Sequence, residues 1–281
     1  MGRFRYSYSV PAPSAEDVAG PIDKMARLGY DAVELGGELP LVEAERVRDL
    51  VEGTGMAVSS ICPSFTSERD LSHPDRAVRE HAVRYVRELA DLASAVGAQT
   101  VIIAPTAFLR NQPIASEEEE WRWAVESIRA GGEYAGALGV NLTLECWNRY
   151  GTYMLNRLEQ AVRLWHETGL PNGGVMADTY HMNIEERSLP ETIRRTGDLL
   201  NYIHLSDSNR AAPGQGHVDV RAILEALAEI DYRGYLTFEL DPQAALRSGA
   251  VPAEGRADPP SWLMERAIEH TRMLESRVEG T

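Results

Sequence analysis

The sequence contains few cysteines and no long apolar run. Only Cys62 and Cys146 occur among its 281 residues, too few for the disulfide framework that stabilises small secreted domains, so we expect two reduced thiols. No apolar run approaches the roughly 18 residues that a membrane-spanning helix needs. The start of the chain also lacks the apolar core of a signal peptide. The sequence therefore predicts a cytoplasmic protein that does not insert into a membrane.

Basic residues are also scarce relative to acidic ones. The chain has 28 Lys and Arg against 43 Asp and Glu, which gives a formal net charge of −15 and a pI of about 4.9. Because a surface of that sign repels phosphate backbones, nucleic acid is not an expected partner. Hydrophobic residues make up 43% of the chain and charged residues 25%, which is typical of a globular protein and not of a disordered one.

Short strand-like segments alternate with longer amphipathic segments along the whole chain. The predicted strands are 4–9, 32–35, 57–61, 100–104, 140–145, 173–178, 201–206 and 235–240. Stretches between them, such as 75–96, 117–138 and 220–230, repeat apolar residues at helical spacing. Eight such units predict an α/β protein, a single (β/α)8 TIM barrel domain over residues 1–281. The Pro- and Gly-containing segment 241–260 is predicted to be a long loop after the eighth strand.

The fifth to eighth predicted strands each end on a side chain that can bind a metal ion. These strand-end residues are Glu145, Asp178, His204 and Glu239. Because alternate residues of a strand share a face, all four are expected to point into the barrel mouth. Taken singly, each is also compatible with a salt bridge or a helix N-cap. Together, three carboxylates and one imidazole predict a site for one hard divalent cation, Mn²⁺ first, with Mg²⁺ or Co²⁺ as alternatives.

Two further polar residues follow the sixth and seventh strands. His181 lies three residues after Asp178, and Arg210 lies six residues after His204. At these strand exits they are placed to bind carbonyl or hydroxyl oxygens of a substrate and to stabilise a developing enediolate charge. In isolation, either residue would more often have a structural or solvated role, so the prediction depends on their position.

These motifs resemble those of a known family. Residues 178–186, Asp-Thr-Tyr-His-Met-Asn-Ile-Glu-Glu, are similar to the signature of the ketose 3-epimerases, the D-tagatose and D-allulose 3-epimerase group of the xylose-isomerase-like superfamily. Glu145 followed by Asn-Arg-Tyr at 148–150 resembles the first glutamate motif of that group, and Asn-Arg at 209–210 resembles its arginine loop. The likeness covers most of the chain and keeps the motifs in barrel order.

The resemblance implies an activity and a role for each site residue. The four strand-end residues would bind one divalent metal ion, and Glu145 and Glu239 among them would also be the catalytic acid and base. His181 and Arg210 would bind the substrate near its carbonyl group. The implied enzyme is an isomerase or epimerase that catalyses 3-epimerisation of a ketose or related keto sugar through a metal-stabilised cis-enediolate. We expect it to form a homodimer or homotetramer.

Three features depart from the pattern of the ketose 3-epimerases. Gly151 stands where that group has a further glutamate, which helps to hold the first carbons of the sugar. Cys146 and Trp147 follow the first glutamate in place of small or aliphatic residues, and the segment 241–260 is unusual. The loss of a polar contact changes substrate discrimination, and Trp147 is predicted to contact a larger, flatter substrate than a free ketohexose.

Two other functions are compatible with the same residues. Some barrels of this superfamily are lyases, such as the C-glycoside deglycosidase catalytic subunits that cleave 3-oxo-glycosides together with a small partner subunit. In that case the same metal and base would act, and an aglycone would be eliminated by carbon–carbon cleavage. A metal- or sugar-binding barrel without turnover is a third hypothesis. The apurinic-site endonucleases share the fold but need more metal ligands and a basic face, which this acidic chain lacks.

Overall fold

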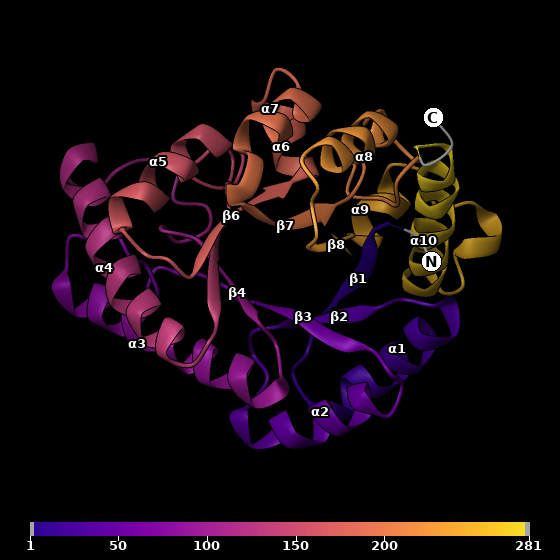
Figure 1. Ribbon diagram of the computed structural model, residues 1–281, viewed down its shortest axis with the longest axis horizontal. Coiled ribbons are helices and arrows are strands. Elements are labelled where there is room, and N and C mark those ends of the chain that lie inside the picture. Colours follow the sequence, from indigo (N-terminus) through magenta and orange to yellow (C-terminus); the bar gives the residue numbers. More distant parts are fainter. Residues whose placement is uncertain (1–2, 279–281) are drawn as a thin grey trace.

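The computed structural model describes residues 3–278 and contains a closed barrel of eight parallel strands (Figure 1). Each strand pairs with the next one along the chain, and β1 also pairs with β8, which closes the ring. The strands are β1 (Arg5–Val10), β2 (Ala32–Gly36), β3 (Ala57–Cys62), β4 (Thr100–Ile103), β5 (Asn141–Leu144), β6 (Gly173–Asp178), β7 (Leu200–Leu205) and β8 (Tyr235–Phe238). The predicted (β/α)8 barrel is confirmed.

Helices surround the strands and form the outer layer of the barrel (Figure 1). They are α1 (Ala15–Leu28), α2 (Ala44–Glu52), α3 (Arg76–Val96), α4 (Glu117–Ala137), α5 (Leu158–Thr168), α6 (Thr179–Glu185), α7 (Leu189–Thr196), α8 (Val220–Glu229), α9 (Pro242–Arg247) and α10 (Pro259–Val278), with 3-10 turns η1 (Leu41–Glu43), η2 (Gly197–Leu199) and η3 (Ala253–Gly255). Ser14, Asp75 and Ser116 accept a hydrogen bond from a first-turn amide of α1, α3 and α4, which fixes where these helices begin. Between residues 3 and 278, no helix is both long and apolar enough to cross a membrane.

The alternation of side chains along β7 shows which face of the strands forms the site. Ile203 is buried in the main core, which also contains the apolar helix residues. Its neighbour Tyr202 lies inside the barrel, where its hydroxyl is 2.8 Å from Ser59 Oγ on β3 and accepts a hydrogen bond from Thr237 Oγ1 on β8 at 2.6 Å. His204 lies two residues after Tyr202 on the same strand, so its side chain points to the same, inward face, next to this polar cluster.

The segment after β8 differs from its predicted form. The sequence predicts a long loop over 241–260, but the structure contains α9 and η3 there, and α10 begins at Pro259. Asp241 caps α9 by accepting hydrogen bonds from the amides of Gln243 and Ala244, and Pro242 follows it at the start of the helix. Proline is favoured at that position because the missing N–H would be unpaired there anyway. Two of the prolines that indicated a loop therefore begin helices.

Candidate metal centre and active site

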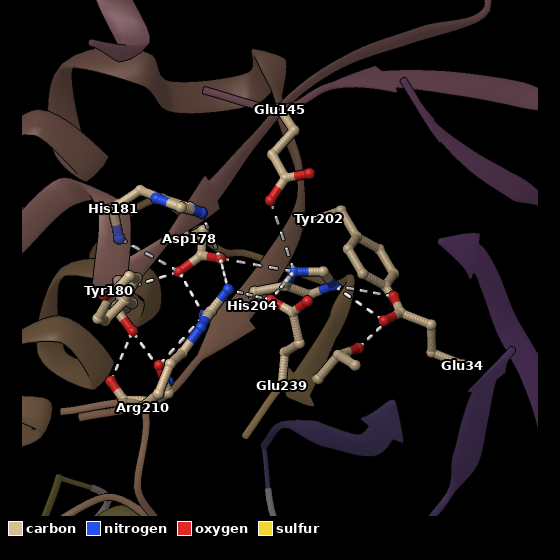
Figure 2. A network of polar contacts seen from close by, with 12 residues as sticks. Glu34, Glu145, Asp178, Tyr180, His181, Tyr202, His204, Arg210 and Glu239 are labelled. Carbon is tan, nitrogen blue, oxygen red and sulfur yellow. Dashed lines mark hydrogen bonds and ion pairs between the residues drawn. The ribbon is translucent and has the colours of Figure 1, made fainter. Parts of the chain in front are cut away.

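The four strand-end residues converge at the mouth of the barrel (Figure 2). Glu145 and Glu239 are the first residues after β5 and β8, and His204 lies one residue before the end of β7. Asp178 ends β6 and also caps α6, because its Oδ1 accepts a hydrogen bond from the Tyr180 amide at 2.8 Å. Since parallel strands end at the same edge of the barrel, residues distant in sequence meet there.

The imidazole of His204 lies at the centre of the group. Its Nδ1 is 3.0 Å from Glu239 Oε2, 3.7 Å from Asp178 Oδ2 and 4.0 Å from Glu145 Oε1. One donor atom from each of the four residues lies within 4.8 Å of all the others. Glu145, Asp178 and His204 are buried, and Glu239 is partly open to the cleft above.

These donor atoms fit one hard divalent cation. Two buried atoms, His204 Nδ1 and Asp178 Oδ2, make ion pairs with Glu239 and Arg210 but no well-formed hydrogen bond. A cation placed between them would satisfy both atoms. Ligands about 2.1 Å from an octahedral ion lie about 3.0 Å apart when adjacent and about 4.2 Å apart when opposite. The distances from His204 Nδ1 fall within or close to this range. Three carboxylates with one imidazole are suited to a hard cation rather than to one that prefers thiolates.

A fourth carboxylate, Glu34 on β2, holds the other side of His204 and was not predicted from the sequence. Both of its oxygens lie 3.0 Å from His204 Nε2, and both residues are fully buried (Figure 2). Ser60 Oγ donates a further hydrogen bond to Glu34 Oε2 at 2.6 Å. In the neutral form of His204, the proton on Nε2 is shared with Glu34, which leaves the Nδ1 lone pair directed at the other strand-end residues.

A second group of potential ligands overlaps with the first. Glu34, Cys62 and His204 also lie close enough to hold one ion. Burial, together with the charge of Glu34, raises the pKa of the Cys62 thiol well above its usual value, so it does not readily become the thiolate that binds metals. In addition, Nε2 of His204 already forms a hydrogen bond with Glu34. The strand-end residues are therefore the better candidate metal centre.

The carboxyl groups of the site differ in their affinity for protons. Burial, with the negative charges of Glu239 and Asp178, raises the pKa of Glu145 to about 8. Burial disfavours ionisation of Asp178 and Glu239, but the positive charges of Arg210 and His204 together act against it, and the pKa of both carboxyl groups is lowered. Burial opposes a charge on His204, but the surrounding carboxylates raise its pKa well above the usual value. Without a cation, protons are held on Glu145 and His204.

His181 reaches the same cleft from the first turn of α6, as predicted from its spacing. Its Nδ1 accepts a hydrogen bond from the Asn148 backbone amide at 3.1 Å. Because an amide can only donate, Nδ1 carries no proton and Nε2 carries the ring proton. Burial lowers the pKa of His181 and favours this neutral form. Its Nε2–H, 3.7 Å from Asp178 Oδ2, is a fixed donor beside the metal centre.

Arg210 contacts two of the strand-end residues directly. Its Nη1 and Nη2 lie 3.0 and 2.9 Å from the two oxygens of Asp178, and Nη2 also donates to Glu239 (Figure 2). The guanidinium lies over the Tyr180 ring, 4.7 Å from its centroid. Arg210 has a positive φ of 59°, unusual for a residue with a side chain, which turns the loop back toward the site. It therefore orients two of the candidate metal ligands and also lines the cleft.

Trp147, predicted to contact the substrate, lines the cleft above the metal centre. The cleft has a volume of about 1030 Å³ and is also lined by Glu145, His181, Arg210 and Glu239. Asp178 and His204 do not line the cleft but lie among Glu145, His181, Arg210 and Glu239 (Figure 2). The structure thus places every predicted site residue at one end of the barrel.

Comparisons with known proteins agree with this geometry. The chain is 32% identical over 227 residues to D-psicose 3-epimerase of Ruminiclostridium cellulolyticum, covering 78% of this chain and 76% of that protein. It is 27% identical over 255 residues to 3-dehydro-D-guloside 4-epimerase of Escherichia coli, covering 88% and 94%. The crystal structure of D-allulose 3-epimerase from Methylomonas sp., in complex with D-allulose, matches with a TM-score of 0.83 at 26% identity, covering 97% and 98%.

The fold and the site define an enzyme of the isomerase and epimerase class with a candidate centre for one divalent cation. A model of the xylose isomerase-like TIM barrel family matches residues 22–264. The chain belongs to that family, as the motifs at 145–150, 178–186 and 209–210 predicted.

Proposed function

We propose that the protein is a metal-dependent epimerase that inverts the carbon next to the ketone of a ketose or related keto sugar. The observation that carries the proposal is the position of Glu145 and Glu239. They follow β5 and β8, on opposite sides of His204, and both open into one cleft. Epimerisation needs a proton taken from one face of a carbon and another returned to the opposite face. Two separate carboxyl groups facing one bound substrate meet that requirement.

Each residue has a defined task in this proposal. Glu145 and Glu239 exchange the carbon-bound proton, one acting as base and the other as acid. A divalent cation bound by the four strand-end residues supplies a Lewis acid that stabilises negative charge developing on the substrate oxygens. The Nε2–H of His181 donates to a substrate oxygen, and Arg210 keeps Asp178 and Glu239 oriented.

The proposal extends to the cofactor, the assembly and the compartment. We assign Mn²⁺ as the preferred ion, with Mg²⁺ or Co²⁺ as substitutes, on the grounds of three carboxylates and one imidazole. The partner is a small keto sugar or sugar derivative, in line with the relatives named for D-psicose and 3-dehydro-D-guloside. We further propose a homodimer or homotetramer in the cytoplasm, where the two free cysteines stay reduced.

The test follows proton exchange with solvent. Keto sugars are incubated with the Mn²⁺-loaded enzyme in D₂O, and NMR follows deuterium at the carbon next to the ketone. We expect exchange and a new epimer with the wild type, and neither with Glu145→Gln or Glu239→Gln. Bound Mn²⁺ is measured in each variant, because both glutamates are also candidate ligands. Full exchange in either metal-loaded variant contradicts the assigned roles, and release of an aglycone from a keto glycoside would indicate the lyase alternative.

A further inference from the structure

The cleft extends well beyond the metal centre. Its volume of about 1030 Å³ lies at the upper end of the range, about 300–1,000 Å³, that accommodates drug-sized ligands. Its lining includes the catalytic candidates and also the loops that follow β3 and β4, among them Phe65, Phe108, Leu109 and Ile114. We call the part of the cleft that these two loops line its second end.

The second end has an apolar surface open to solvent. Phe108, Leu109 and Ile114, all from the loop between β4 and α4, are 52%, 64% and 57% exposed. The Phe108 ring packs edge-on against Trp147, with ring centroids 5.1 Å apart and planes at 86°. We call Phe108, Leu109, Ile114 and Trp147 the apolar subsite. Large apolar side chains exposed together at the rim of a cleft are typical of a binding surface.

Phe108 occupies space next to Gly151. A Cβ atom added at Gly151 would lie 3.1 Å from Phe108 Cε2 and 3.1 Å from Trp147 Cβ, closer than ordinary contact. A side chain here, such as the glutamate that the resemblance to the ketose 3-epimerases implies, would therefore press against the Phe108 ring and Trp147. In this chain, an aromatic surface replaces a polar contact to a sugar hydroxyl.

Backbone hydrogen bonds and buried ion pairs hold Phe108 in place. Its amide donates to the Phe65 carbonyl at 2.9 Å, and the next amide, of Leu109, donates to the Gly151 carbonyl at 2.7 Å. The following residue, Arg110, forms salt bridges with the fully buried carboxylates of Asp70 and Glu120, at 2.8 and 2.5 Å. Because the loop is tied to its neighbours, the apolar subsite exists before any ligand binds.

We propose that the apolar subsite binds a flat, apolar aglycone, so that the preferred substrate is a keto sugar in glycosidic form and not a free ketose. This inference rests on the proposed function, because the ketone has to reach the metal centre while the aglycone contacts Phe108 and Trp147. The Phe108 ring is 52% exposed and offers apolar surface beside Trp147, which lines the cleft but is itself buried. Burying a flat group against Phe108 is favourable in water.

The experiment compares two substrates that differ only in the aglycone. The phenyl and methyl glycosides of one 3-keto-hexose, and the free keto sugar, are incubated with Mn²⁺-loaded enzyme in D₂O. NMR gives kcat/KM for deuterium exchange next to the ketone. We expect the phenyl glycoside to be preferred over the methyl glycoside by about tenfold or more, the scale on which apolar pockets discriminate. Phe108→Ala should remove most of that preference, and Phe108→Leu, which keeps an apolar side chain, should remove less.

The matched control is Tyr150→Ala. Tyr150 lies in the adjacent loop and is 68% exposed, but it does not line the cleft, so its loss should leave the phenyl-to-methyl ratio unchanged. Equal rates for the two glycosides, or an unchanged ratio in a folded Phe108→Ala variant, overturn the inference. Exchange on the free keto sugar alone also overturns it but leaves the proposed function standing. No exchange on any keto sugar contradicts the proposed function itself.

Discussion

Replacing Glu34 by Gln tests whether a residue outside the metal ligands sets the affinity of the site. The change keeps the shape of the side chain but removes the charge that faces His204 Nε2 at 3.0 Å. An ion bound to His204 Nδ1 would be separated from Glu34 by the imidazole ring, because Glu34 lies 3.0 Å from Nε2 on the far side of that ring. At a separation of roughly 7 Å, a full Coulomb interaction with a divalent charge is worth about 5 kcal/mol at an effective dielectric constant of about 20. Part of this interaction energy cancels, because Glu34 also stabilises the proton on His204, and the ion has to displace that proton.

We therefore expect Glu34→Gln to weaken Mn²⁺ binding by about 10- to 100-fold, the usual effect of losing a carboxylate that orients a ligating histidine. Titration calorimetry or competition with a fluorescent chelator measures the dissociation constant. The matched control is Glu275→Gln. Glu275 is also buried and accepts hydrogen bonds from the Phe4 amide and the Tyr6 hydroxyl, at 2.9 and 2.8 Å, but it belongs to α10 and lies outside the site.

The control variant should lose stability in thermal unfolding while keeping the wild-type affinity for Mn²⁺. If folded Glu34→Gln binds Mn²⁺ within twofold of the wild type, the Glu34–His204 contact does not orient the ligand. If Glu275→Gln weakens binding equally, the loss reflects general destabilisation. Either result would refute the reasoning.

Two further predictions concern protons and the loop that carries the apolar subsite. Because Glu145 has a pKa of about 8 and His204 one well above its usual value, an ion that needs both deprotonated should displace about two protons at pH 7. Its affinity should rise as pH increases toward 8. Calorimetry in buffers of different ionisation enthalpy measures the release, and no proton release would contradict the assignment. Arg110→Met leaves two buried carboxylates unpaired and should lower the free energy of unfolding by about 3–5 kcal/mol, measured by urea denaturation. A change below 1 kcal/mol would show that the ion pairs do not hold the loop.

The barrel and the position of its candidate metal ligands follow from regularities within short segments. The strand ending at Asp178 was predicted with the observed bounds, Gly173–Asp178, as one of the short strand-like segments between amphipathic helices. The alternation of faces along a strand then places Asp178 and His204 inside, because neighbouring parallel strands end together. These inferences need no knowledge of distant contacts.

Other features depend on contacts between distant segments and could not be predicted. Glu34 was included in a predicted strand, and a carboxylate facing inward between Ala32 and Leu35 was the available signal. Its partner His204, however, is 170 residues away. The contact between Phe108 and Gly151 likewise joins two loops, so the sequence shows that a glutamate is missing but not what occupies its place.

The charges at the barrel mouth would allow a divalent ion to replace two protons there. Without an ion, protons on Glu145 and His204 leave three carboxylates, including Glu34, against the imidazolium and Arg210, one net negative charge. With a divalent ion, Glu145 ionises and His204 becomes neutral, so four carboxylates face Arg210 and the two charges of the ion. The net charge is again minus one. Since the exchange does not change the charge buried in the barrel, it avoids the large cost of an uncompensated buried ion. Arg210 takes no part in the exchange, and so it can hold Asp178 in place in both states.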